Sequence, residues 1–250
     1  METKVIAVAN HKGGVGKTTS VASIGIGLSQ RGYKVLLVDL DAQANLSSFF
    51  LPETEEDRES IYDSLISGKP LPIQEVGENL FLVPSGLEMA RAEGDLNGKI
   101  ARERLLNLIL EPIKDNYAYI LIDCPPSLGI VTTNAFVAST DIYVPLTAEA
   151  LPLKGMRMLE EYIEAIRVIR KDLRISGIFI TRYNNRNLNN VVEAEIKKRY
   201  EKVVFSTKIR ENISLAEVPL CGGNIYEYAP ASNGATDYGR LTEEIIERNK

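Results

Sequence analysis

The stretch "HKGGVGKTTS", residues 11–20, follows the apolar run "VIAVAN" at 5–10 and leads directly into a helical pattern. The apolar run is typical of a buried strand, so the order is strand, glycine-rich loop and helix. Gly13, Gly14 and Gly16 let the backbone turn so that several N–H groups converge on one point. The N-terminus of the following helix adds the positive end of its dipole there. This arrangement predicts a cradle for phosphate groups.

Two lysines flank the three glycines of this loop, and the second has the simpler interpretation. Gly-Lys-Thr between a loop and a helix is typical of P-loop nucleotide hydrolases. Lys17 would reach the β- and γ-phosphates, and the Thr18 hydroxyl would bind Mg²⁺. The standard pattern opens with a glycine where this chain has His11, so the loop is a variant form. The expected nucleotide contacts are Gly13, Gly14, Val15, Gly16, Lys17, Thr18 and Thr19.

The composition is that of an ordinary soluble globular protein, with 44% hydrophobic and 25% charged residues among 250. A net charge of −5 argues against a protein covered in positive charge, although 29 lysines and arginines leave room for a local basic face. No apolar stretch approaches the roughly 20 residues that span a bilayer. Because the first strand begins so close to the first residue, we expect no signal peptide. Two cysteines, Cys124 and Cys221, do not make a disulfide framework. We therefore expect a cytoplasmic protein with two buried, inert thiols.

Short β-branched runs alternate with longer helical patterns along the whole chain. Helices are expected over about 17–30, 151–170, 187–200 and 234–249. Further strands are expected at 34–40, 80–85, 117–126, 140–147 and 173–181. This alternation predicts a single α/β domain over residues 1–250, a mostly parallel twisted sheet with helices on both faces. In such sheets the ligand site lies at the carboxyl ends of the strands.

Three carboxylates stand where two of these strands end. "YILIDCPPS" ends its apolar run at Asp123, the expected position of an acidic residue that holds Mg²⁺. "VLLVDLDAQAN" ends with Asp39 and Asp41, which point the same way on an extended chain. We assign Asp41 to orienting or activating the water that attacks the γ-phosphate. Asp39 would serve the outer shell of the metal or hold the loop.

Four motifs together resemble one known family. "KGGVGKTT", "VLLVDLDAQAN", "ILIDCPPSLGIVTTNAFVAS" and "ISLAEVP" are similar to the deviant-Walker P-loop ATPases of the ParA and MinD superfamily. The likeness runs over nearly the whole chain and is closest to the small ParA/Soj-type partition proteins. It implies a role for the first lysine of the loop. Lys12 would cross the interface of an ATP-sandwich dimer and contact the nucleotide of the partner.

The resemblance also implies a mechanism. ATP and Mg²⁺ would favour the dimer, and the dimer would bind DNA without sequence preference. A ParB-like centromere-binding protein would stimulate a slow hydrolysis and release the DNA, so that a plasmid or chromosome is partitioned. We expect the protein to lack the N-terminal helix-turn-helix domain of larger ParA proteins.

The residues expected at the base and at the DNA are a mixture of matches and departures. Asn212 matches the asparagine of the family near the adenine, and Arg210 replaces the proline found two residues earlier. Arg186 fits an arginine that related proteins use on DNA. Glu211 and Ser214 stand in the stretch where arginines are usual, which would weaken phosphate binding. Other cations that could compensate are Lys197, Lys198, Arg199, Lys202, Lys208 and Arg210.

Other members of the superfamily supply the alternatives. A MinD-like switch would position a protein or membrane partner, but the C-terminal "YGRLTEEIIERNK" makes a poor basic membrane anchor. An iron–sulfur reductase would need a cysteine pair in each subunit. An amidoligase-type biosynthetic enzyme is expected to need an added catalytic domain. We therefore expect a self-associating ATPase without a membrane partner.

Overall fold

The computed structural model describes residues 2–51, 58–148, 152–184, 187–221 and 223–250. Within them the chain forms one sheet of eight strands. The strands are β1 (Lys4–Val8), β2 (Val35–Asp39), β3 (Gln74–Gly77), β4 (Leu80–Val83), β5 (Tyr119–Asp123), β6 (Asp141–Thr147), β7 (Ile175–Tyr183) and β8 (Val204–Arg210). Their order across the sheet is β3-β4-β2-β5-β1-β6-β7-β8. Every neighbouring pair is parallel except β3 and β4.

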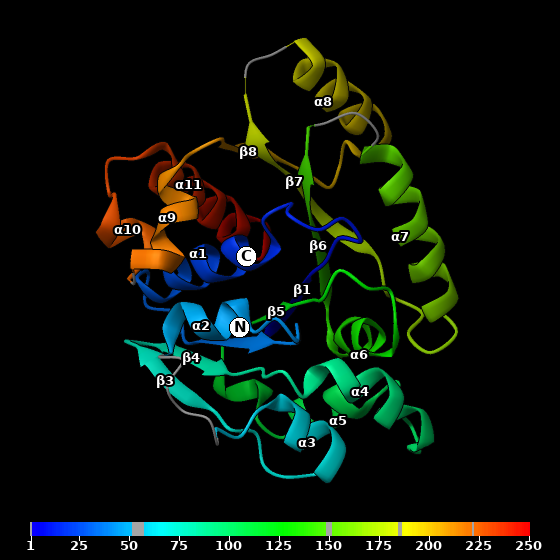
Figure 1. The fold of residues 1–250 in the computed structure, drawn as a ribbon. Coiled ribbons are helices and arrows are strands. Elements are labelled where there is room, and N and C mark those ends of the chain that lie inside the picture. The colour runs from blue at the N-terminus through cyan, green and yellow to red at the C-terminus, as the bar shows by residue number, and fades with distance from the viewer. Residues whose placement is uncertain (1, 52–57, 149–151, 185–186, 222) are drawn as a thin grey trace.

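Helices lie on both faces of this sheet (Figure 1). They are α1 (Lys17–Ser29), α2 (Asn45–Phe50), α3 (Ile61–Ser67), α4 (Met89–Asp95), α5 (Leu105–Leu110), α6 (Ile130–Ala138), α7 (Pro152–Ile166), α8 (Asn187–Tyr200), α9 (Ser214–Cys221), α10 (Ile225–Tyr228) and α11 (Asn233–Arg248), with 3₁₀ turns η1 (Leu96–Gly98) and η2 (Lys114–Asn116). The expected α/β architecture with a mostly parallel sheet is confirmed. That residues 1–250 form a single domain stays a prediction.

Two hydrophobic cores lie on opposite faces of the sheet, because successive residues of a strand point to opposite sides. In β5, Leu121 faces the core shared with α1 and α11, and Ile122 faces the core shared with the helices from α3 to α8. The central strands are buried on both faces, which is why their sequences are almost continuously apolar. Asp123 therefore lies on the α1 face, at the carboxyl end of its strand.

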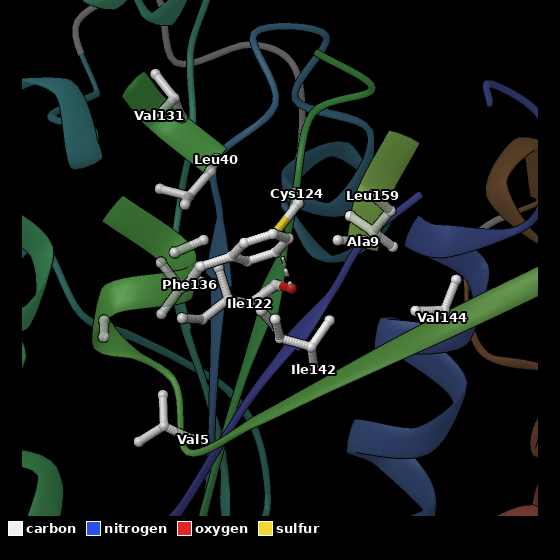
Figure 2. Packing of buried hydrophobic residues seen from close by; sticks show 14 of the residues in the cluster. Val5, Ala9, Leu40, Ile122, Cys124, Val131, Phe136, Ile142, Val144 and Leu159 are labelled. Atoms are coloured by element: carbon white, nitrogen blue, oxygen red, sulfur yellow. Dashed lines mark hydrogen bonds between the residues drawn. The ribbon is translucent and has the colours of Figure 1, made fainter. Parts of the chain in front are cut away.

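The buried cysteine lies on the other face of the sheet. Cys124 packs in the core beside Ala9, Phe136 and Leu159 (Figure 2). Burial raises the pKa of its thiol far above the usual range, so this cysteine is inert. Cys221 at the end of α9 is exposed, so the expectation of two buried thiols is wrong for this residue.

Two strands were not expected from the sequence. β3 is an antiparallel edge strand of four residues with a polar pattern, and β8 lies within a basic stretch. Both are short or mixed in polarity, since an edge strand is covered less completely than a central one. β8 changes the interpretation of "TKIRENISLAEVP": this segment is the end of a strand, a short connection and the start of α9.

Candidate phosphate and nucleotide site

The glycine-rich loop connects β1 to α1 at the carboxyl edge of the sheet. Gly14 has φ 71° and Gly16 has φ 84°, in the left-handed region where a side chain would strain the backbone. Gly13 has no positive φ, and a Cβ built on it would meet no atom within 4 Å. The fold of the loop therefore does not require glycine at position 13. The lack of a side chain there leaves the space beside the backbone open.

Three polar side chains hold this loop in place. The Asn10 amide donates to the Pro145 carbonyl at 2.7 Å, while its Oδ1 accepts from the Lys12 N–H at 2.9 Å. The Thr181 hydroxyl donates to the Val15 carbonyl at 2.8 Å. The Ser20 hydroxyl donates to the Gly16 carbonyl at 2.6 Å and also lies 2.9 Å from the hydroxyl of Tyr238 in α11. The loop is thus pinned by β6, β7 and α11.

The two lysines of the loop occupy different environments. Lys17, the first residue of α1, is buried, whereas Lys12 is exposed. The Lys12 ammonium lies 3.4 Å from the Thr147 hydroxyl at the end of β6. Thr18 and Thr19 are partly buried in the first turn of α1, behind Gly16. Lys17 thus lies inside the site and Lys12 at its rim, and the separate roles assigned to them stay a prediction.

Asp123 and Asp39 stand side by side at the ends of β5 and β2. They are paired in the register of the two parallel strands, and both are fully buried. Neither carboxylate oxygen of Asp123 accepts a hydrogen bond from the described residues. Burial raises the pKa of Asp123 well above its usual range and the nearby Asp39 adds to this, while Thr18 and Lys17 oppose it. Lys17 thus offsets only part of the cost of burying this carboxylate, which forms no ion pair within the described part of the chain.

Both carboxylate oxygens of Asp39 accept hydrogen bonds from the segment that follows β2. Its Oδ2 accepts from the Ser47 N–H at 2.9 Å and the Ser47 hydroxyl at 2.7 Å, and its Oδ1 accepts from the Asp41 N–H at 3.1 Å. Burial raises the pKa of Asp39 to about 6, against the effect of these hydrogen bonds. The Ser47 hydroxyl in turn accepts from the Ser85 N–H beyond β4. Of the two roles left open, these contacts favour holding the loop.

Asp41 lies one step further into the loop between β2 and α2. It is partly exposed, and its Oδ1 accepts from the Gln43 N–H at 3.0 Å. Ala44 follows with a φ of 51°, which turns the chain into α2. The backbone therefore presents Asp41 at the same edge of the sheet as Asp123, with one carboxylate oxygen outside this turn.

A cavity of about 520 Å³ opens beside the glycine-rich loop. Gly14, Gly16 and Thr19 form its wall on the loop side, and the rest comes from the ends of β7 and β8, the start of α9, and α11. Most of the surface that lines it is apolar, although polar and charged side chains also contribute, and such a mixture is usual in a pocket for a small organic molecule. The remaining lining residues are Thr181, Arg182, Ile209, Arg210, Glu211, Asn212, Ile213, Leu215, Ala216 and Tyr238.

Both residues expected at the base line this cavity. Asn212 accepts from the Ser214 N–H at 2.8 Å through its Oδ1, so its amide group is oriented by the first turn of α9. Arg210, the last residue of β8, makes an ion pair with Asp237 of α11 at 2.7 Å. Asp237, Tyr238, Asn10 and Thr181 were not anticipated, because their partners are distant in sequence and no local pattern marks them.

Several of the cations that could compensate on a DNA face form ion pairs within the chain. Lys197 and Lys208 both pair with Glu193, at 2.8 and 2.6 Å, and Arg199 pairs with Glu160 at 2.8 Å. Lys198 and Lys202 are exposed. Arg186 lies outside the described residues. The structure therefore brings fewer available positive charges to this region than the sequence suggested.

Two further observations concern a metal ion and a membrane. The described residues contain no cluster of three or more acidic, histidine or cysteine side chains that could hold a metal alone. A magnesium ion commonly takes one or two protein oxygens and completes its shell with water and phosphate, so Asp123 and Thr18 suffice in kind. Among the helices in the described part of the chain, none is long and apolar enough to cross a membrane.

Comparison with known sequences identifies relatives over almost the full length. A family model described as an AAA domain matches residues 3–175. The sporulation initiation inhibitor protein Soj of Bacillus subtilis is 38% identical, covering 97% of this chain and 98% of its own. The chromosome partitioning protein ParA of Caulobacter vibrioides is 33% identical, covering 99% and 95%.

Solved structures also match this chain over almost its full length. A cobyrinic acid a,c-diamide synthase from Mycobacterium smegmatis with a bound ATP analogue and magnesium is 31% identical, with a TM-score of 0.85 and coverage of 98% of this chain and 95% of that one. The solved chain is therefore about as long as this one. A plasmid partition protein from Borrelia burgdorferi is 27% identical, with a TM-score of 0.80 and coverage of 99% and 100%. With its full-length likeness to Soj and ParA, the chain belongs to the ParA/Soj family of P-loop ATPases.

Proposed function

We propose that this chain is a Mg²⁺-dependent, slow ATPase that forms an ATP-sandwich homodimer and acts in plasmid or chromosome partition. The ATP-bound dimer binds DNA without sequence preference, and a ParB-like partner stimulates hydrolysis and releases it. Residues 1–250 act as one domain in this cycle. The names of the Soj and ParA relatives, and the ATP analogue and magnesium in the solved relative, support the proposal.

One observation carries the nucleotide part of this proposal. Asp123 is fully buried at the end of β5, on the same face of the sheet as α1 and its Lys17, and neither of its carboxylate oxygens has a hydrogen-bond partner among the described residues. A buried carboxylate without a hydrogen-bond donor is costly, and it persists where a cation compensates it. Magnesium bound to a nucleotide is the cation that this position favours. It would neutralise the charge that develops on the phosphates.

The roles of the site residues follow from their positions. Lys17 binds the β- and γ-phosphates from inside the site, and the N–H groups of the loop surround them. Thr18 and Asp123 hold the magnesium ion, with Asp39 fixing the neighbouring loop. Asp41 orients the attacking water from the edge of the sheet. Lys12 reaches from the rim toward the nucleotide of the partner.

Lys12→Ala is expected to bind ATP as a monomer and to fail to form the sandwich dimer. The backbone N–H of Lys12 is held by Asn10, so the loop keeps its shape when the side chain is removed. An ammonium delivered to the phosphate of the partner rewards association only when ATP is bound. Light scattering with ATP, in an Asp41→Ala background that preserves the nucleotide, measures the mass. A dimer of normal stability in the double variant would exclude this role.

DNA binding is expected to depend on ATP and to fade steeply as salt is raised, because phosphate contacts displace counterions. Co-sedimentation with non-specific duplex DNA, in ATP and in ADP at two salt concentrations, measures it. Arg186→Ala should lower the binding, and Lys171→Ala, which removes the same charge from the exposed loop before β7, should not. Equal losses in both variants would mean that only total charge matters.

The alternative is a MinD-like switch that positions a protein or membrane partner. The intramolecular pairing of Lys197, Arg199 and Lys208 favours it, since these cations are less available to DNA. The C-terminal helix argues against a membrane partner, because its apolar face, including Leu241 and Ile245, is buried in the core. ATP-dependent dimerisation without DNA binding in either nucleotide would select the protein-partner alternative.

A further inference from the structure

The cavity beside the glycine-rich loop contains an arginine whose geometry is fixed by a buried acid. The Arg210 Nε lies 2.9 Å and 3.2 Å from the two carboxylate oxygens of Asp237, and its Nη2 lies 2.7 Å from Oδ1. The backbone N–H of Arg210 also donates to Asp237 Oδ2 at 2.9 Å. Asp237 thus takes four contacts from a single residue, an arrangement that leaves the guanidinium little freedom to turn.

The two partners differ sharply in exposure. The Asp237 side chain is 4% exposed, while the Arg210 side chain is 43% exposed and lines the cavity. The carboxylate therefore binds the edge of the guanidinium that Nε and Nη2 form. The Nη1 amino group has no acceptor within the described part of the chain.

An arginine can contribute a positive charge and a planar group to a binding site, and the contact with Asp237 affects the two differently. Its charge is balanced by the adjoining carboxylate, so it adds little net attraction for phosphate. Its planar group remains, and a guanidinium plane stacks well on an aromatic ring. Ile209, Ile213 and Ala216 supply apolar surface to the same wall, and Arg182, Glu211 and Asn212 add further polar groups. Arg210 differs from the other arginine because its plane is held in place by a buried carboxylate.

We propose that Arg210, clamped by Asp237, is the stacking surface for the purine base of the bound nucleotide and sets the preference for purine over pyrimidine. This inference rests on the proposed nucleotide site, because the same cavity is walled by Gly14, Gly16 and Thr19 of the phosphate cradle. Phosphates in the cradle leave the base directed along the cavity toward β8. Asp237 is a positioning residue that acts through Arg210.

A second contact ties this clamp to the cradle. Tyr238, the next residue of α11, is buried and lies 2.9 Å from the Ser20 hydroxyl, which itself donates to the Gly16 carbonyl. Consecutive residues of one helix therefore hold the arginine of the cavity and the backbone of the phosphate loop. Base and phosphate positions are fixed relative to each other by α11.

The test compares binding of Mg-ATP, Mg-CTP and magnesium tripolyphosphate by titration calorimetry. Tripolyphosphate carries the phosphates without a base, so it reports the cradle alone. Arg210→Ala is expected to weaken ATP binding about tenfold, the usual scale for loss of one stacked base, and to leave tripolyphosphate binding unchanged. The ratio of ATP to CTP affinity should fall toward one.

Two further variants distinguish the effect of the planar guanidinium of Arg210 from the effects of its charge and of the fold. Arg210→Lys keeps the charge and loses the plane, so it should behave like Arg210→Ala. Asp237→Asn releases the clamp and should give a smaller loss for ATP, again with none for tripolyphosphate. Arg31→Ala is the matched control, since Arg31 pairs with Glu243 of the same helix at 2.8 Å and does not line the cavity. It should change neither affinity.

The remaining outcomes overturn the proposal in distinguishable ways. ATP binding unchanged in both Arg210 variants would show that the base lies elsewhere. Equal losses for ATP and tripolyphosphate would assign Arg210 to the phosphates or to the fold, and full rescue by Arg210→Lys would assign its effect to charge. If the wild-type protein binds neither ATP nor tripolyphosphate, the proposed nucleotide site itself fails, and the stacking role fails with it.

Discussion

Lys17→Ala is expected to abolish ATP binding at concentrations that saturate the wild-type protein. Lys17 is buried at the start of α1, so the phosphates it meets would be shielded from water. Removing one partner of a buried, charged pair typically costs about 3–5 kcal/mol. That loss corresponds to an affinity lower by roughly a hundredfold or more. Fluorescence titration with a labelled ATP analogue, or calorimetry with ATP, measures it.

The control for this variant removes an equal charge from the surface. Lys171→Ala lies in an exposed loop before β7 and should bind ATP like the wild-type protein. A thermal melt without nucleotide checks that Lys17→Ala is folded, since a buried side chain has been shortened. A folded Lys17→Ala protein with wild-type ATP affinity would remove Lys17 from the site.

Asp41→Ala is expected to bind ATP normally and to hydrolyse it at least about a hundredfold more slowly, the usual contribution of a positioned acid or base. Asp41 is partly exposed at the edge of the sheet, and the buried Asp39 and Asp123 beside it are left intact. Nucleotide and magnesium would thus be held while the attacking water is not oriented. The ATP dimer should accumulate, and single-turnover hydrolysis with radiolabelled ATP measures the rate.

Asp41→Asn separates chemistry from structure at this position. The amide keeps an oxygen that can accept from the Gln43 N–H, so the turn into α2 is preserved. It cannot take a proton, and hydrolysis should be as slow as in Asp41→Ala. Wild-type turnover in Asp41→Asn would mean that the residue only shapes the loop.

The sequence predicted those parts of the molecule that depend on local rules. Gly14 and Gly16 adopt the positive φ angles that only glycine tolerates easily, and Lys17 begins the helix directly after them. The apolar runs are buried strands because both faces of the sheet are covered. Asp123 lies at a strand end in one buried row with Asp39, as expected for neighbouring parallel strands.

Other features could not be predicted because they join segments far apart in the chain. Asp39 accepts a hydrogen bond from Ser47, and Asp237 accepts one from Arg210. The spacing of these residues in the sequence does not indicate either contact. The basic residues near α8 looked available for DNA in the sequence, yet Glu160 and Glu193 neutralise several of them. Charge pairing depends on which surfaces meet after folding, and composition alone carries no information about it.

The strand–loop–helix phosphate cradle, the α/β class and the family could all be predicted without a structure, because each depends on patterns of residues close together in the chain. It took the folded structure to show that Asp123 has no hydrogen-bond partner among the described residues, that Asp39 holds a loop, and that Arg210 is clamped at a cavity wall. Burial and hydrogen-bond partners are set when β2, β5, β8 and α11 come together. Because this packing gives Asp39 and Asp123 different partners, two aspartates at neighbouring strand ends acquire different roles.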